Sequence, residues 1–282
     1  MLGDCHIHMV LDGVDYRRAL ARHRPKAQDE WIRDRLSEYA RAGVWFLRDG
    51  GDALGAAKRA SELAPEYGIV YRTPLYPICR KGRYGEFIGR SFSDFVEYRV
   101  LVDEVVENGG NFIKIMISGL MDFNRFGVIT SIPLERAEIA DMIAYAHDRG
   151  MAVMAHANGA QTIRDALDAG VDSIEHGAYM DDECVSQLAK SGAVWVPTLV
   201  TIGNLIGCGR YPDEVLRPLL ALQMKNVRTF AEHGGTIAAG SDSGAYLVPH
   251  VQGIRDELAL LKQAGIDEKM LLAGEKRIRE IF

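Results

Sequence analysis

The sequence predicts an α/β protein, and in particular a closed parallel (β/α)8 barrel, the TIM-barrel fold. Eight short apolar runs alternate along the chain with amphipathic segments of helical period. The chain has 282 residues, close to the roughly 250 that are typical of this fold. Hydrophobic residues make up 48% of the chain, enough for a large core. A doubly wound open sheet is the alternative fold, because it would use the same alternation of elements.

The predicted strands are short runs dominated by apolar residues, and they cover 2–10, 44–47, 69–71, 112–117, 152–155, 173–175, 194–197 and 236–239. The predicted helices place apolar residues three or four apart and often stop at glycine, and they cover 29–41, 54–63, 95–107, 133–149, 160–169, 183–190, 212–232 and 254–263, with a short helical tail to 282. A long loop rich in proline and glycine follows the third strand. No linker or change of composition interrupts the pattern, which predicts that residues 1–282 form a single domain.

Composition narrows the range of partners. The net charge of −6 argues against a nucleic-acid partner, which would require a basic face. The four scattered cysteines (Cys5, Cys79, Cys184 and Cys208) form no CxxC pair and indicate reduced thiols in a cytoplasmic protein. No signal peptide and no apolar run of about 18 residues is visible, so no membrane partner is expected. Composition is compatible with a monomer or a homo-oligomer.

Polar side chains stand at the carboxyl ends of predicted strands, which is where barrel enzymes carry their active sites. His6 and His8 are two residues apart and therefore share one face of a strand. By themselves they are equally compatible with two surface or core histidines. Lys114 lies within an apolar strand, where an unpaired ammonium is costly unless the side chain points outward between helices.

Three further strand ends carry ligand-type residues: His156, His176 and Asp242. Each has an ordinary explanation, because the histidines could be hydrogen-bonded core residues and the aspartate could cap a helix. Together, however, five of the eight predicted strand ends present an ionisable group at one end of one barrel. Imidazole and carboxylate ligands suit zinc, and also iron, manganese or nickel. The combination predicts a metal site.

This pattern resembles the amidohydrolase superfamily, which has HxH on strand 1, lysine on strand 4, histidines on strands 5 and 6 and aspartate after strand 8. The match extends from Gly3 to about Gly265 and is most similar to the branch of dipeptidase (prolidase-like) and imidazolonepropionase-like hydrolases. Its remaining motifs are Arg48-Asp49-Gly50-Gly51, Ser118-Gly119, Ser173-Ile174-Glu175-His176-Gly177, Pro197-Thr198-Leu199 and Gly240-Ser241-Asp242-Ser243-Gly244. The chain leaves no room for the β-sandwich that flanks the barrel in many relatives, so we expect either a barrel alone or a sequence that stops short of its native terminus.

The resemblance implies a metal-dependent hydrolase of an amide, cyclic amide or dipeptide-type C–N bond, or of a lactone. It implies two divalent ions, most simply two Zn²⁺, bridged by a carboxylated Lys114. His6, His8 and Asp242 would hold the more buried ion, and His156 and His176 the more exposed one. A bridging hydroxide would attack the carbonyl, and Asp242 would carry the proton to the leaving group.

Two other functions fit the same pattern. The first is a deaminase with one metal ion, although the acid that such relatives place shortly after the strand-5 histidine is replaced here by Ala157-Asn158-Gly159-Ala160. The second is a barrel that binds a metal or a small molecule without turnover. The six filled ligand positions favour the hydrolase.

The loops after strands 3, 4 and 6 suggest groups that could bind a small-molecule substrate. They offer Arg80, Tyr84, Arg125 and Tyr179. The cations among them favour a substrate with a carboxylate, which arginine can grip bidentately. For each of these residues a solvated loop side chain is the competing interpretation.

Overall fold

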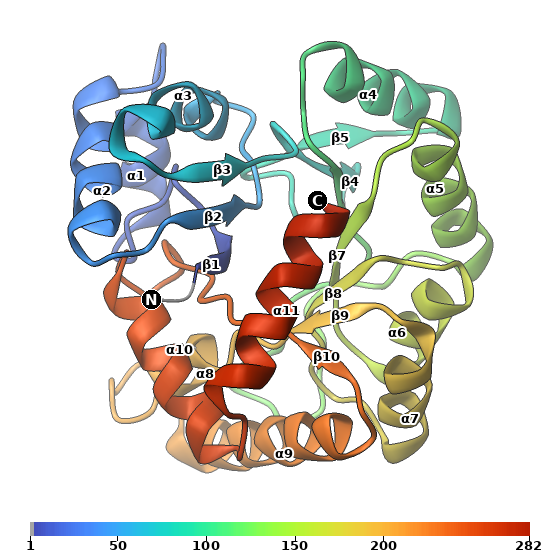
Figure 1. Cartoon of the computed structure of the whole chain (residues 1–282). Helices are drawn as coiled ribbons and strands as arrows, with labels where there is room; N and C mark the ends of the chain where they lie inside the picture. The colour runs from blue at the N-terminus through green and yellow to red at the C-terminus, as the bar shows by residue number, and fades with distance from the viewer. Residues whose placement is uncertain (1–2) are drawn as a thin grey trace.

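The computed structural model describes residues 3–282; Leu2, at the start of the predicted first strand, lies outside the described residues. The strands are β1 (Asp4–Ile7), β2 (Phe46–Asp49), β3 (Val70–Arg72), β4 (Pro77–Arg80), β5 (Arg90–Phe92), β6 (Ile113–Met116), β7 (Val153–Ala157), β8 (Ser173–His176), β9 (Val194–Val196) and β10 (Thr236–Ile237). The helices are α1 (Tyr16–Arg22), α2 (Asp29–Arg41), α3 (Ala56–Leu63), the 3-10 turn η1 (Ala64–Tyr67), α4 (Phe95–Glu107), α5 (Arg136–Asp148), α6 (Ala160–Asp168), α7 (Asp182–Ser191), α8 (Val200–Gly203), α9 (Asp213–Glu232), α10 (Gln252–Gln263) and α11 (Glu268–Ile281). Figure 1 shows the strands surrounded by the helices, in the order of the chain.

The strands pair in parallel in two sheets, β1-β2-β3 and β10-β9-β8-β7-β6-β4-β5. Backbone hydrogen bonds also join β1 to the segment after β10, from Cys5 N to Ala239 O (2.9 Å), from Asp242 N to His6 O (2.7 Å) and from His8 N to Ser243 O (2.8 Å). The two sheets therefore meet at β1, and the α/β class with parallel strands is confirmed.

The segment after β3 differs from the prediction. We expected a loop over residues 74–89, whereas β4 and β5 form there and in the residues that follow. β4 takes the place beside β6, with Ile78 opposite Ile115. A proline at the first position of β4 and the glycines around it hide the short apolar run of Ile78 and Cys79 from a search by pattern. The tail also differs, because α11 is a full helix of 14 residues.

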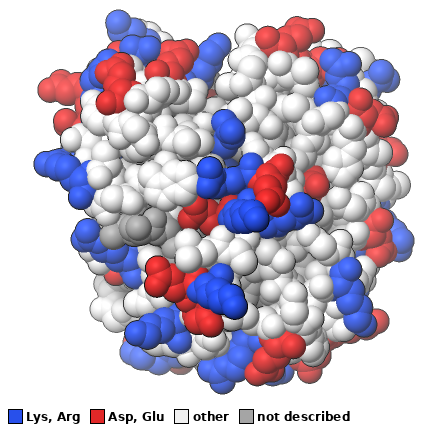
Figure 2. All heavy atoms as spheres, in the orientation of Figure 1, with Lys and Arg blue, Asp and Glu red and all other residues white. Residues whose placement is uncertain are grey.

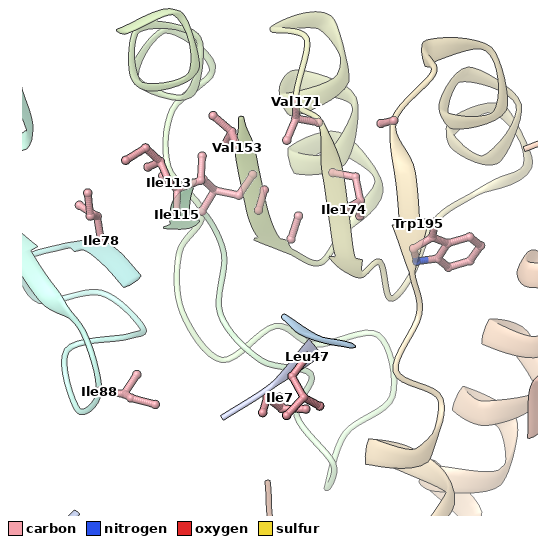
Figure 3. Packing of buried hydrophobic residues seen from close by; sticks show 14 of the residues in the cluster. Ile7, Leu47, Ile78, Ile88, Ile113, Ile115, Val153, Val171, Ile174 and Trp195 are labelled. Carbon is pink, nitrogen blue, oxygen red and sulfur yellow. The ribbon is translucent and has the colours of Figure 1, made fainter. Parts of the chain in front are cut away.

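The main core lies between the strands and the surrounding helices. Figure 3 shows Ile113, Ile115, Val153 and Ile174, which come from β6, β7 and β8 and belong to one buried cluster. Because neighbouring residues of a strand face opposite sides, the residues between them face inward. In this register Lys114 lies beside Met154, and His156 lies beside Met116. The register thus brings the polar residues of adjacent strands to one place.

α11 covers the amino ends of the strands, and Figure 1 shows it crossing in front of them. Gly274 approaches β10 so closely that a Cβ atom there would lie 1.8 Å from the Ile237 carbonyl oxygen. Phe282 packs edge-on against Phe112, with ring centroids 5.2 Å apart. This end of the strands is therefore closed by packing, which leaves the carboxyl ends for the site.

Charges of both signs are interspersed over the face that α11 occupies. Figure 2 shows Lys and Arg beside Asp and Glu across this face, with no single large basic patch. Within residues 3–282, no helix is both long enough and apolar enough to span a membrane.

Candidate metal centre

A cavity of about 730 Å³ opens at the carboxyl ends of the strands. All six residues predicted as metal ligands line it: His6, His8, Lys114, His156, His176 and Asp242. They come from β1 and the residue just after it, from β6, β7 and β8, and from the loop after β10, so the fold brings together positions that span most of the chain.

One group of donors consists of His6, His8 and Asp242, whose ligand-type atoms lie within 4.8 Å of one another. The Oδ1 atom of Asp242 is 3.5 Å from His6 Nε2 and 3.3 Å from His8 Nε2. Glycine at position 50 makes room for His8, because a Cβ atom there would lie 2.4 Å from the His8 ring. Two imidazoles and a carboxylate that converge in this way are a donor set suited to a divalent cation.

The second group consists of His156 and His176, whose ring centroids are 4.6 Å apart. His176 Nδ1 lies 2.7 Å from Thr198 Oγ1, so its Nε2 is the nitrogen that remains for a ligand. The His176 ring is also 5.2 Å from that of His6, which makes the two donor groups direct neighbours.

Lys114 lies in the same cavity, and its side chain is buried with no hydrogen-bond partner for Nζ in the part of the chain that the structure describes. Burial lowers the pKa of Lys114 to about 8 and that of His6 to about 4. Burial also lowers the pKa of His156 to about 3, so both histidines are neutral at pH 7, as metal ligands must be. A buried amine without a hydrogen-bond partner costs free energy, and a ligand that binds to Lys114 Nζ would reduce that cost.

A buried ion pair supports His6 from behind. Glu175 Oε2 lies 2.7 Å from His6 Nδ1, and Glu175 Oε1 lies 2.8 Å from Arg48 Nη2. Arg48 also donates hydrogen bonds to the Cys5 carbonyl (2.7 Å) and to Ser173 Oγ (3.0 Å). Burial alone would raise the pKa of Glu175, but Arg48 and His6 outweigh it and lower the pKa to about 2. The charged carboxylate fixes the ring orientation of His6.

Three residues of the site have a left-handed backbone that side chains with Cβ seldom adopt. The φ angles are +67° at His176, +48° at Thr198 and +57° at Asp242. Such conformations cost free energy and cluster at functional sites, where the surrounding structure enforces them. Here the carbonyl of His176 accepts hydrogen bonds from Trp195 Nε1 (3.0 Å) and from Gln223 Nε2 (2.5 Å), which hold the turn.

Of the four residues predicted to bind substrate, one lines the cavity. Tyr84 lines the cavity, with its ring centroid 4.9 Å from that of His156. Within residues 3–282, the other three are not among the lining residues. Arg80 forms an ion pair with Glu138, Arg125 forms one with Asp122 at 2.8 Å, and Tyr179 packs against Phe126 with ring centroids 5.5 Å apart.

Sequence reasoning missed two sets of residues. Arg48 and Glu175 were noted only as parts of motifs, although a charged residue within an apolar strand is the same signal that singled out Lys114. The mouth of the cavity was missed almost entirely, because Tyr246 alone among its residues was considered for substrate binding. It includes Tyr16, Arg17, Phe87, Arg210, Tyr211 and Tyr246, which lie on loops or a short helix and follow no periodic pattern.

Comparison with known proteins agrees with this geometry. The model of the family described as "Amidohydrolase family" matches residues 2–271. The chain belongs to the amidohydrolase family. Members of this family generally use divalent metals, and the donor groups described above fit that requirement.

Several relatives are similar over parts of their length. An uncharacterized protein of Mycobacterium tuberculosis, Rv2915c, is 33% identical over 127 residues, which are 43% of this chain and 34% of the relative. Ochratoxinase of Aspergillus niger is 26% identical over 218 residues, 74% of this chain and 41% of the relative. The chain thus spans less than half the length of these relatives.

Solved structures show the same fold. A Xaa-Pro dipeptidase with bound methionine superposes with a TM-score of 0.76 and 22% identity, covering 99% of this chain and 75% of the other. The structure of the A. niger ochratoxinase superposes with a TM-score of 0.78 and 22% identity, covering 97% and 68%. The family model and these superpositions establish the family and the fold of the chain.

Proposed function

We propose that the protein is a metal-dependent hydrolase that cleaves an amide, cyclic amide or dipeptide-type C–N bond, with lactones as a further substrate type. The observation that carries the proposal is the convergence of six ligand-type residues on one cavity. We also propose that residues 1–282 act as one domain, a closed (β/α)8 barrel, and that the protein is cytoplasmic.

The donor groups suggest two divalent ions, and zinc suits their nitrogen and oxygen atoms. His6, His8 and Asp242 would hold one ion, and His156 and His176 the other. When bound, the ions supply Lewis acidity that lowers the pKa of water and polarises a carbonyl oxygen.

Lys114 is proposed to be carboxylated. Its pKa of about 8 leaves a substantial neutral fraction near pH 7 to 8, and the neutral amine can attack CO₂. The N–C bond forms as one C=O π bond of CO₂ breaks, the nitrogen releases a proton to water, and the product is a carbamate anion. Carboxylation would change the Lys114 side chain from an unpartnered cation into an anion that two metal ions could share.

Asp242 is proposed as the group that moves the proton. One carboxylate oxygen accepts a proton from the attacking water and then delivers it to the leaving nitrogen. Burial would raise the pKa of Asp242, but His6 and His8 outweigh it and lower the pKa, so the side chain is ionised at neutral pH and ready to act as a base. Glu175 and Thr198 hold the rings of His6 and His176 in place during the reaction.

Two experiments test the proposal together. Metal analysis of the purified protein should give two ions per chain, and chelation should abolish hydrolysis of acylated amino acids, dipeptides, cyclic amides or lactones. Equilibration with ¹³C-bicarbonate should give a carbamate carbon resonance that Lys114→Ala lacks. One ion per chain with an unmodified Lys114 would contradict the two-metal form and favour the one-metal deaminase, and bound metal without turnover of any substrate would favour a binding protein.

A further inference from the structure

Two arginines at the mouth of the cavity have no acidic partner among the described residues. Within residues 3–282, no carboxylate oxygen lies within 4.0 Å of the Arg17 or Arg210 guanidinium nitrogens, although both residues line the cavity. Arg80 and Arg125, by contrast, are already paired with Glu138 and Asp122 and lie outside the lining. The cations that are available to a ligand are therefore not those that the sequence pattern suggested.

Arg210 is the better placed of the two for an anion. Its guanidinium carbon lies 4.5 Å from the ring centroid of Tyr246 and 5.3 Å from that of Tyr211. Stacking on aromatic faces restricts a guanidinium while leaving its in-plane N–H groups for a carboxylate. Arg17 has one aromatic neighbour instead of two: its guanidinium carbon lies 5.5 Å from the ring centroid of Tyr16, its Nε donates to Tyr16 Oη at 3.1 Å, and the acidic Asp15 precedes that tyrosine in the chain.

Two separate groups of apolar side chains line the cavity and form its walls. One wall is aromatic: the ring centroid of Phe87 lies 5.6 Å from that of Tyr16 and 5.8 Å from that of Tyr84. The other wall includes Met121 and Leu205, which belong to one apolar cluster. A cavity of about 730 Å³ accommodates a drug-sized ligand, so there is room for an apolar group on each side of a scissile bond.

We propose that the substrates are amides of amino acids with bulky apolar groups on both sides of the scissile bond, and that Arg210 binds their free carboxylate. This inference rests on the proposed hydrolase function and deepens it, because it assigns a substrate class and a specificity-determining residue. The polar end of the substrate lies at the mouth, the apolar groups lie along the two walls, and the amide reaches the metal centre.

Binding is measured first, independently of turnover. Calorimetry compares N-benzenesulfonyl-leucine with N-isopentylbenzenesulfonamide, which lacks only the carboxylate, on the protein as purified; neither compound contains a hydrolysable amide. The carboxylate should improve affinity by about 10- to 100-fold, the range of a hydrogen bond to a charged group. Arg210→Ala should abolish that difference. Arg136→Ala, which removes an exposed arginine on α5, should retain it.

Turnover is then compared for N-benzoyl-leucine, N-isopentylbenzamide and N-acetylglycine. Arg210→Ala should raise KM for N-benzoyl-leucine by about 10- to 100-fold with kcat nearly unchanged, and should leave N-isopentylbenzamide unaffected. Arg210→Lys should recover only part of the loss, because an ammonium lacks the planar fork. N-acetylglycine should have the lowest kcat/KM of the three substrates.

The outcomes separate the two proposals. A carboxylate preference in binding that depends on Arg210, without hydrolysis of any amide, would support the anion site and contradict the hydrolase function. Hydrolysis without a carboxylate preference, or with a preference that Arg210→Ala leaves intact, would overturn the inference and leave the hydrolase function standing. Loss of the preference in Arg17→Ala alone would also overturn the assignment to Arg210.

Discussion

The floor and the mouth of the same cavity are built in opposite ways. At the floor, buried side chains hold the candidate ligands from behind: Glu175 lies 2.7 Å from His6, and Thr198 lies 2.7 Å from His176. At the mouth, Tyr16 and Phe87 are 47% and 42% exposed, and the two rings pack against each other. One region is held in a single arrangement, and the other is open to solvent.

This difference indicates a division of labour. Catalytic groups work only when their geometry is held closely, and buried supporting partners provide that control. Exposed loop residues tolerate change and adapt to different ligands, which suits recognition. Substitutions at the floor should therefore reduce kcat and metal binding for every substrate, whereas substitutions at the mouth should change KM for particular substrates.

The largest effect is expected for Asp242→Asn at the floor. The amide keeps the shape of the side chain but cannot accept the proton, so kcat should fall by about 10²- to 10⁴-fold. Steady-state kinetics on the best substrate of the panel, together with metal analysis, measures the loss. Asp168→Asn, at an exposed position on α6, is the matched control and should leave kcat unchanged. A D242N enzyme that retained more than a tenth of the activity would contradict the assigned role.

Glu175→Gln should have the next largest effect. Without the carboxylate that faces His6 Nδ1, metal affinity should fall by about 10- to 100-fold, as measured by competition with a chelator. The variant also leaves Arg48 buried without its anion, which should lower the free energy of unfolding by about 3–5 kcal/mol in urea denaturation.

A double variant separates support of the metal site from stability. Arg48→Met combined with Glu175→Gln removes the unpaired charge and should recover much of the lost free energy of unfolding. Metal affinity should stay low, because His6 still lacks its carboxylate. If metal affinity returned together with stability, Glu175 would be a structural residue and not a positioning one.

The mouth should respond more weakly and more selectively. Phe87→Ala removes a half-exposed ring from the aromatic wall, and KM for N-benzoyl-leucine should rise by about 3- to 10-fold. The kcat should stay nearly constant, and N-acetylglycine, which has no bulky group, should serve as the control substrate. An equal rise in KM for both substrates, or a fall in kcat with KM unchanged, would contradict the proposed distinction between the wall and the floor of the cavity.

The same contrast explains how much could be predicted from the sequence. Strand alternation and strand ends are regular, so the α/β class and the six ligand-type positions followed from pattern alone. β4 and β5 did not, because Pro77 and the glycines around these short strands resemble a loop and their pairing with β6 is a tertiary contact. Arg48 and Glu175 belonged to visible motifs, but their ion pair joins β2 to β8 through space and has no signature along the chain.

The mouth was less predictable for a physical reason. Whether an arginine is free or paired depends on which acid lies next to it, and the acid can be far away in sequence. Arg80 pairs with Glu138 from α5, whereas Arg210 stacks on Tyr246 from a different loop. The sequence shows which residues after strand 3 are basic. It does not show that a carboxylate of the protein already pairs with Arg80.

The smallest effect is expected for the arginines that the sequence pattern favoured. Arg80→Ala and Arg125→Ala remove side chains whose charge is already met by Glu138 and Asp122, and exposed ion pairs of this kind contribute about 0–1 kcal/mol. KM for N-benzoyl-leucine should therefore change less than about twofold in either variant, measured beside Arg210→Ala in the same assay. A rise in KM as large as that of Arg210→Ala would mean that a paired arginine exchanges its own carboxylate for that of the substrate. The loop cations would then be the recognition site, and the contrast between paired and free arginines would lose its meaning.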